Sequence, residues 1–260
     1  MLKANELFDL EPSARKEKIV SQIPNYEQLS DRRAPNKSKE TAMVINSFIG
    51  DYFDYRIRKD KEGSRGSILS PENIEQAVQS VIDVRNSRVS DIFNDVPKKD
   101  SMKDSYLNIY EMSDALNLAI SNHVTRRISN LIGGLWEDFA AISPYAINPD
   151  HEFKLKIVGI DLISKNIETS EVEYQQLKTG KGTLTGSQAP RSKLELSIHD
   201  NPVFCVALDN KASWTFNDLN IPRVSGVDFW KRIGMPYDII EAKAITFIKD
   251  TEKKFSELTK

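Results

Sequence analysis

Two short segments in the second half of the chain hold side chains suited to metal-assisted hydrolysis. Asp161 follows an apolar segment, and Gln176-Leu177-Lys178 begins fifteen residues later. Because side chains alternate along a strand, Gln176 and Lys178 are expected on one face of the second segment, with Leu177 on the other. If the two segments pair as strands, Asp161 lies close to Gln176, and a carboxylate and an amide oxygen could bind Mg²⁺ together. Lys178 could then orient or deprotonate a water for phosphodiester hydrolysis.

The strands that must position these side chains are predicted from hydrophobic patterning. Three segments are typical of strands: Phe153–Ile163, Glu171–Lys178 and Pro202–Leu208. Between the second and the third, Arg191–Ile198 has the spacing of a helix. That connection is therefore a crossover, and the two strands that it joins are expected to be parallel. A further short strand is predicted around Val224.

The remaining elements are predicted to be helices, because their apolar residues recur at helical spacing. One helix begins at Ser70 and Pro71, a capping residue and a first-turn proline, and ends before Pro97. A long helix is expected from about Ser105 to Ala141, with a break at Gly133-Gly134. The other predicted helices cover Ile45 to Phe53, Asp228 to Ile233 with Asp228 as the cap, and Tyr237 to Leu258.

These elements predict an α/β fold with a central mixed sheet flanked by helices. Residues 1–100 are expected to form a helical N-terminal region, and residues 101–260 are expected to form the core that contains the sheet.

Asp161 followed by Gln176-x-Lys178 resembles the PD-(D/E)xK nuclease core, in the variant where glutamine replaces the middle acid. The resemblance covers about Gly134 to Ile233. Its other features are a helix before the core strand, Gly180-Lys181 after the lysine, a crossover helix with an apolar strand, and Gly226 to Trp230 near the end. Ile160 stands where a proline often precedes the first acid, and Gln176 leaves the site with fewer carboxylates.

The resemblance implies a restriction-endonuclease-like core and Mg²⁺-dependent cleavage of double-stranded DNA by a homodimer, as in type II restriction endonucleases. Asp161 and Gln176 would hold Mg²⁺, and Lys178 would handle the water. In this family a glutamate on the helix before the core often joins the metal site, and Glu137 occupies that position. Helical phase places Glu137 opposite the apolar stripe unless Gly133-Gly134 resets the helix.

Two further acids, Glu171 and Glu173, are also candidates for the metal site. Their strand parity is opposite to that of Gln176, so they are expected to face solvent unless a bulge turns them.

DNA contacts are expected where cations gather without acids. The segment from Gln175 to Lys193 contains no acid, and it offers both cations and neutral donors. The candidate contacts in this segment are Lys181, Thr183, Thr185, Gln188, Arg191 and Lys193. A second candidate is the predicted loop from Arg56 to Ser67, through Arg56, Arg58 and Arg65. Each segment would also fit a solvated surface loop.

Composition excludes several other classes of protein. The formal net charge of −2 excludes a uniformly basic coat, and one cysteine with three histidines leaves no Cys/His zinc cluster. No apolar run approaches the roughly 20 residues that span a bilayer, so a cytoplasmic protein without a membrane segment is expected. The alternatives to a restriction endonuclease are a repair or junction-processing nuclease with the same core, or a non-catalytic DNA-binding or helical interaction protein.

Overall fold

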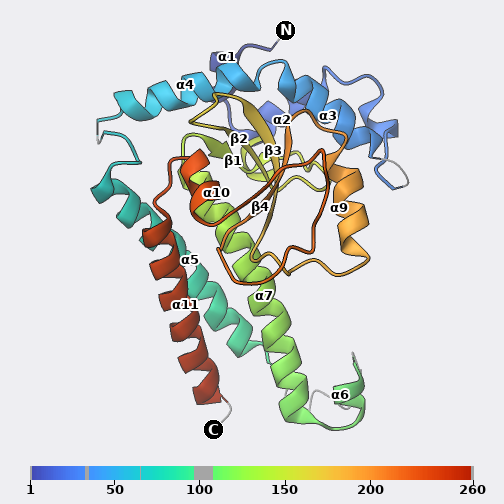
Figure 1. The fold of residues 1–260 in the computed structure, drawn as a ribbon, viewed down its shortest axis with the longest axis vertical. Coiled ribbons are helices and arrows are strands. Elements are labelled where there is room, and N and C mark those ends of the chain that lie inside the picture. Colours follow the sequence, from blue (N-terminus) through green and yellow to red (C-terminus); the bar gives the residue numbers. More distant parts are fainter. Residues whose placement is uncertain (1, 33–34, 65, 97–107, 259–260) are drawn as a thin grey trace. The chain divides into compact units, whose positions relative to one another are not determined.

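The computed structural model describes residues 2–32, 35–64, 66–96 and 108–258 (Figure 1). The chain forms two compact units, residues 1–77 with 136–237 and residues 78–135 with 238–260. Neither unit has a boundary at residue 100. The two long helices α5 (Pro71–Asn94) and α7 (Leu116–Ile142) each contribute residues to both units, so composition along the chain does not reveal the division.

The first unit contains a five-stranded mixed sheet in the order β1-β2-β3-β4-β5. The pairs β1–β2 and β2–β3 are antiparallel, whereas β3–β4 and β4–β5 are parallel. Helix α9 packs on β3 and β4, and α10 packs on β5. This confirms an α/β fold with a mixed sheet flanked by helices, and the predicted parallel crossover through α9. The bounds are β1 Ala146–Ile147, β2 Leu162–Lys165, β3 Val172–Lys178, α9 Gln188–Leu196, β4 Pro202–Val206, β5 Arg223–Ser225 and α10 Val227–Arg232.

The predicted strand from Phe153 to Ile163 is wrong over most of its length. Helix α8 (Pro149–Phe153) is capped by Asn148, whose side-chain oxygen accepts from two backbone N–H groups, and it ends at Lys154 in the left-handed conformation. An irregular segment follows, and only β2 pairs with the sheet. Leu155, Ile157 and Ile160 are nevertheless buried. The alternating pattern therefore reflects burial of an irregular segment, which periodicity alone cannot distinguish from a strand.

The described part of the N-terminal region is helical, but the helix predicted from Ile45 to Phe53 is not one continuous element. The stripe from Ile45 to Phe53 is divided between α3 and α4, because Phe48 leaves the helical conformation at φ −137°. Helix α4 continues to Glu62, so most of the predicted cationic loop is helical. The helices are α1 Ala4–Phe8, α2 Pro12–Val20, α3 Asn36–Asn46 and α4 Ile49–Glu62, with a 3₁₀ turn at Tyr26–Gln28.

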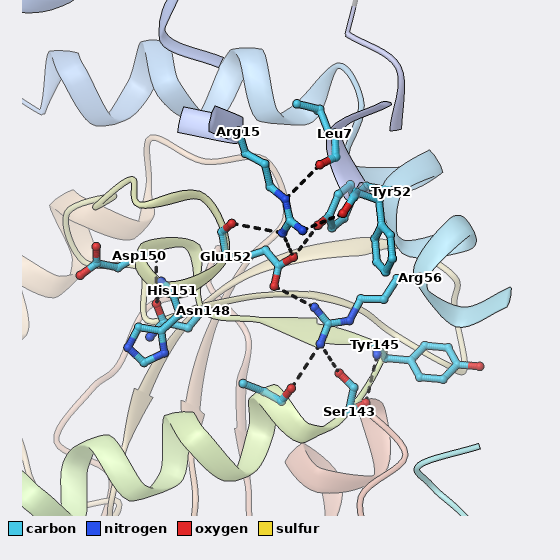
Figure 2. A network of polar contacts seen from close by, with 12 residues as sticks. Leu7, Arg15, Tyr52, Arg56, Ser143, Tyr145, Asn148, Asp150, His151 and Glu152 are labelled. Atoms are coloured by element: carbon cyan, nitrogen blue, oxygen red, sulfur yellow. Dashed lines mark hydrogen bonds and ion pairs between the residues drawn. The ribbon is translucent and has the colours of Figure 1, made fainter. Parts of the chain in front are cut away.

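A partly buried polar cluster around Glu152 connects these N-terminal helices to α8 (Figure 2). The carboxylate of Glu152 accepts from Arg15, from the Tyr52 hydroxyl and, at 3.0 Å, from Arg56 Nη1. Other guanidinium nitrogens donate to backbone carbonyls, such as the Arg15 Nε to that of Leu10 at 2.8 Å and the Arg56 Nη2 to that of Ser143 at 3.4 Å. Burial beside Glu152 raises the pKa of Tyr52. Both arginines are therefore satisfied by the fold.

The bounds of two of the other long helices, α5 and α11 (Tyr237–Leu258), agree with the prediction, whereas those of α7 do not. Helix α5 begins at Pro71 and ends before Pro97. Helix α7 begins at Leu116, because Asp114 takes φ +57° after the short helix α6 (Ile109–Met112). It then continues through Gly133-Gly134 without the expected break. Residues 105–107 of the predicted helix lie outside the described residues. Helix α10 begins after Gly226, so Asp228 is not its cap.

In the part of the chain that the structure describes, no helix has the length and apolar character needed to cross a membrane.

Candidate active site

Asp161 lies directly before β2 and is held against β3. Its backbone N–H donates to the Gln175 carbonyl at 2.9 Å, and its Oδ2 accepts from the Leu177 backbone N–H at 2.8 Å. The same Oδ2 accepts from Lys178 Nζ at 3.3 Å, and both side chains are about a quarter exposed. The antiparallel register of β2 and β3 continues to Asp161, which falls opposite Gln176. The structure thus brings Asp161, just before β2, into contact with Lys178 on β3, and Gln176 lies two residues before Lys178 on the same strand.

Gln176 lacks a donor for its side-chain oxygen. The residue is 5% exposed, and its Oε1 is buried without a hydrogen-bond partner among the described residues. A buried oxygen in this state favours a ligand that brings a donor or a positive charge. The atom faces the same side of β3 as Lys178, because the two residues share strand parity.

The shared face of Gln176 and Lys178 opens into a cleft of about 280 Å³ between β3, the loop after it and α9. The loop is shaped by Thr183, whose Oγ1 donates to the Gly180 carbonyl at 2.6 Å. Gln188, the first residue of α9, accepts from the Thr185 backbone N–H at 2.9 Å. The β3–α9 cleft is lined by Gln176, Lys178, Thr183, Leu184, Gln188, Arg191, Ser192 and Glu195. Three candidate DNA contacts, Thr183, Gln188 and Arg191, therefore line the same cleft as the candidate catalytic residues Gln176 and Lys178.

Glu195 is a carboxylate in this cleft that the sequence reasoning missed. It is 8% exposed, and its Oε1 accepts from Arg191 Nε at 2.6 Å. Gly159, two residues before Asp161, has φ +78°, and a Cβ there would lie 2.7 Å from Glu195 Oε2. The absence of a side chain at Gly159 is what allows this approach. Helical phase is the signal for it, because Glu195 shares a buried side of α9 with Ser192, but Glu195 lies beyond the acid-free segment, which ends at Lys193.

Glu137 lies outside the residues that line the cleft. Its Oε2 accepts from Asn148 Nδ2 at 2.7 Å, so its carboxylate helps to hold the residue that caps α8. Because α7 is continuous, the helix is not reset before Glu137. Its neighbour Trp136 reaches the end of β3 instead, where Nε1 donates to Thr179 Oγ1 at 3.0 Å.

Of the two strand acids, Glu171 is exposed as expected and Glu173 is not. Glu173 is 2% exposed, so the expectation that it faces solvent is wrong. Its carboxylate accepts from Arg232 on α10 at 2.5 Å, and from Asn166 and Gln175 at 2.8 Å each. Arg232, on a helix far along the chain, is one of the donors that satisfy this buried carboxylate. The pattern of the strand alone therefore does not predict that Glu173 is buried.

The cations of the acid-free segment meet acids from elsewhere in the chain. Lys181 Nζ lies 2.5 Å from Asp209 Oδ1 and is 17% exposed, and this hydrogen bond lowers the pKa of Asp209. Lys193 Nζ lies 3.8 Å from Asp218 Oδ2. With Arg191 on Glu195, each of these three cations has a carboxylate partner. A stretch without acids in the sequence is therefore not an unneutralised patch in space.

The second group of candidate DNA contacts is dispersed. Arg56 is held by Glu152 and by backbone carbonyls, so it is not available as a free cation (Figure 2). Arg58 is 60% exposed on α4, with its guanidinium 5.0 Å from the Tyr55 ring. Arg65 lies outside the described residues.

The cleft does not belong to a carboxylate-rich metal centre. Among the described residues, no group of three or more His, Cys, Asp or Glu side chains is placed to hold a metal ion. Cys205 is buried in β4, and burial raises the pKa of its thiol, which disfavours a nucleophilic thiolate.

No protein-family model matches the sequence, and no curated protein matches it significantly. Inference about function therefore rests on the residues of the cleft and on the strands that hold them.

Proposed function

We propose that the protein is a nuclease of the PD-(D/E)xK type that hydrolyses phosphodiester bonds in double-stranded DNA, acting as a type II restriction endonuclease. The observation that carries the proposal is the ion pair between Asp161 and Lys178 beside the unpartnered Oε1 of Gln176. The mixed order of the sheet supports it, because antiparallel β2 and β3 bring the acid to the lysine and parallel β4 follows through α9.

The oxygens at this site fit a hard divalent cation. Asp161 has Oδ1 without a hydrogen bond from the described residues, Gln176 has its orphaned Oε1, and Glu195 adds a second carboxylate across the cleft. Mg²⁺ usually takes few protein ligands and keeps waters and phosphate oxygens, so three oxygens suffice. Asp161, Gln176 and Glu195 would hold Mg²⁺, with Glu195 in the role that was expected of Glu137.

When bound, Mg²⁺ supplies charge that stabilises the phosphate as it is attacked. The protein's own contribution comes from Asp161 and Lys178. Asp161 fixes the Lys178 ammonium at 3.3 Å, at the edge of the cleft. From that position, Lys178 can orient the attacking water and offset negative charge near the scissile phosphate. Arg191 and Gln188, on the cleft wall, offer donors to the DNA backbone.

The proposal includes a homodimer and a cytoplasmic location. Each chain has one Asp161–Lys178 pair, and two strands of a duplex must be broken. Two chains related by a twofold axis would present one such pair to each strand of a palindromic site.

Digestion of phage DNA tests this function and separates it from its rivals. With Mg²⁺ and without chelator, discrete fragments are expected, and addition of chelator should abolish them. Cleavage of a four-way junction in preference to linear duplex would favour a repair or junction-processing nuclease. Binding of duplex with no cleavage of either substrate would favour a non-catalytic DNA-binding protein.

A further inference from the structure

Arg191 and Glu195 form an ion pair whose two members are in different environments. The Glu195 side chain is 11% exposed, whereas that of Arg191 is 74% exposed. A single nitrogen makes the contact, Nε to Oε1 at 2.6 Å. Nη1 and Nη2 of Arg191 make no hydrogen bond to any residue that the structure describes. The guanidinium can therefore leave the carboxylate without breaking other contacts.

The buried carboxylate, in contrast, cannot remain without a positive partner at low cost. Its Oε2 lies against Gly159, two residues before Asp161 in the sequence, and Asp161 is paired with Lys178, which lines the cleft. Gln176, with its orphaned oxygen, lines the same cleft. A cation bound among these oxygens would compete directly with the guanidinium for Glu195.

We propose that Arg191 is a positioning residue that holds Glu195 in place until a divalent cation binds, and that the displaced guanidinium then contacts a phosphate of the DNA. This inference rests on the proposed function. Only the Arg191 side of this i,i+4 pair is exposed to solvent, so the guanidinium can exchange for a divalent cation that keeps the buried Glu195 carboxylate partnered. The planar fork of donors on Arg191, which lines the cleft with Lys178, suits a phosphate group.

Titration with Mn²⁺ in the absence of DNA, followed by calorimetry, tests the inference without measuring cleavage. Mn²⁺ is a suitable probe because it also accepts oxygen ligands. Arg191→Ala should bind Mn²⁺ about 2- to 5-fold more tightly than wild type, because the competing cation is removed. Arg191→Lys should return the affinity towards the wild-type value. Lys231→Ala removes one exposed positive charge on α10 and should leave the affinity unchanged.

Loss of a merely structural contact would weaken Mn²⁺ binding, so tighter binding is specific to the proposed competition. Glu195→Gln, which removes the carboxylate, should weaken Mn²⁺ binding. If Glu195→Gln weakens binding while Arg191→Ala has the wild-type affinity or a lower one, the inference about Arg191 is overturned and the cation site stands. If the wild-type protein does not bind Mn²⁺, both the inference and the cation site of the proposed function are overturned.

Discussion

Gln176 is the residue at which the chemistry of the cleft can be tested most selectively. Its buried Oε1 requires a donor or a cation. Gln176→Glu keeps an oxygen at that position and should preserve some Mg²⁺-dependent cleavage, whereas Gln176→Leu should abolish it. Cleavage assays on both variants, with thermal melting to verify folding, make the comparison. Equal activity in the two would show that the amide oxygen takes no part.

A second prediction at the residue scale concerns His199, which is stacked on Tyr174 at 4.8 Å and is 6% exposed. Burial lowers its pKa to about 4, although nearby Asp200 acts in the opposite direction. In the unfolded chain His199 binds a proton as the pH falls through about 6.5, whereas in the folded chain it does so only near pH 4. The free energy of unfolding should therefore fall as pH decreases from about 6.5 to about 4, by about 3 kcal/mol.

Urea denaturation between pH 4 and pH 7.5 measures this effect, with His199→Phe as the matched variant. Phenylalanine can keep the ring contact with Tyr174 but cannot bind a proton, so the variant should lose less stability on acidification. If wild type and variant lose stability in parallel, other groups are responsible for the pH dependence.

At the scale of elements, α10 is joined to the sheet by the ion pair between Arg232 and buried Glu173. Arg232→Ala leaves that carboxylate with only its two amide donors and should cost about 3 kcal/mol of stability. Lys231→Ala, one residue earlier, breaks an exposed pair with Glu168 and should leave the unfolding transition nearly unchanged. Chemical denaturation of both variants tests this, and equal destabilisation would contradict the role given to Glu173.

Elements with strong local signals were predictable from the sequence. Pro71 marks the start of α5, and the alternation of side chains along β3 predicted the face that Gln176 and Lys178 share. Elements that depend on distant partners were not predictable. The segment Leu155–Ile160 has the sequence pattern of a strand because its apolar residues are buried in the core. Glu173 has the sequence pattern of a surface acid, and its burial depends on the ion pair with Arg232.

The same distinction applies to the candidate site. Asp161 and Lys178 could be placed together because two consecutive segments with strand patterning were expected to pair. Glu195 could not, because its approach depends on how closely α9 packs against Gly159. The acids that neutralise Lys181 and Lys193 lie in the segment after β4, and sequence distance conceals them.

At the scale of the whole molecule, a net charge of −2 means that DNA binding must depend on local cations. Lys193 is 40% exposed and 3.8 Å from its acid, whereas Lys181 is 17% exposed and 2.5 Å from its acid. Lys193→Ala should therefore reduce the log–log salt slope of duplex binding by about 0.9, and Lys181→Ala should change it little. Fluorescence anisotropy at several salt concentrations distinguishes them. A larger effect of Lys181→Ala would indicate that its pair with Asp209 opens on DNA.

The central claim is that Asp161 and Lys178 form the catalytic centre of a Mg²⁺-dependent nuclease, and single-turnover cleavage of duplex DNA tests it most directly. Wild type should cleave, and Asp161→Ala and Lys178→Ala should each reduce the rate by roughly 10²-fold or more. Both variants should fold, because the two side chains are a quarter exposed. Glu168→Ala, an exposed acid elsewhere on the chain, should cleave like wild type. Cleavage at the wild-type rate by either Asp161→Ala or Lys178→Ala would contradict the claim.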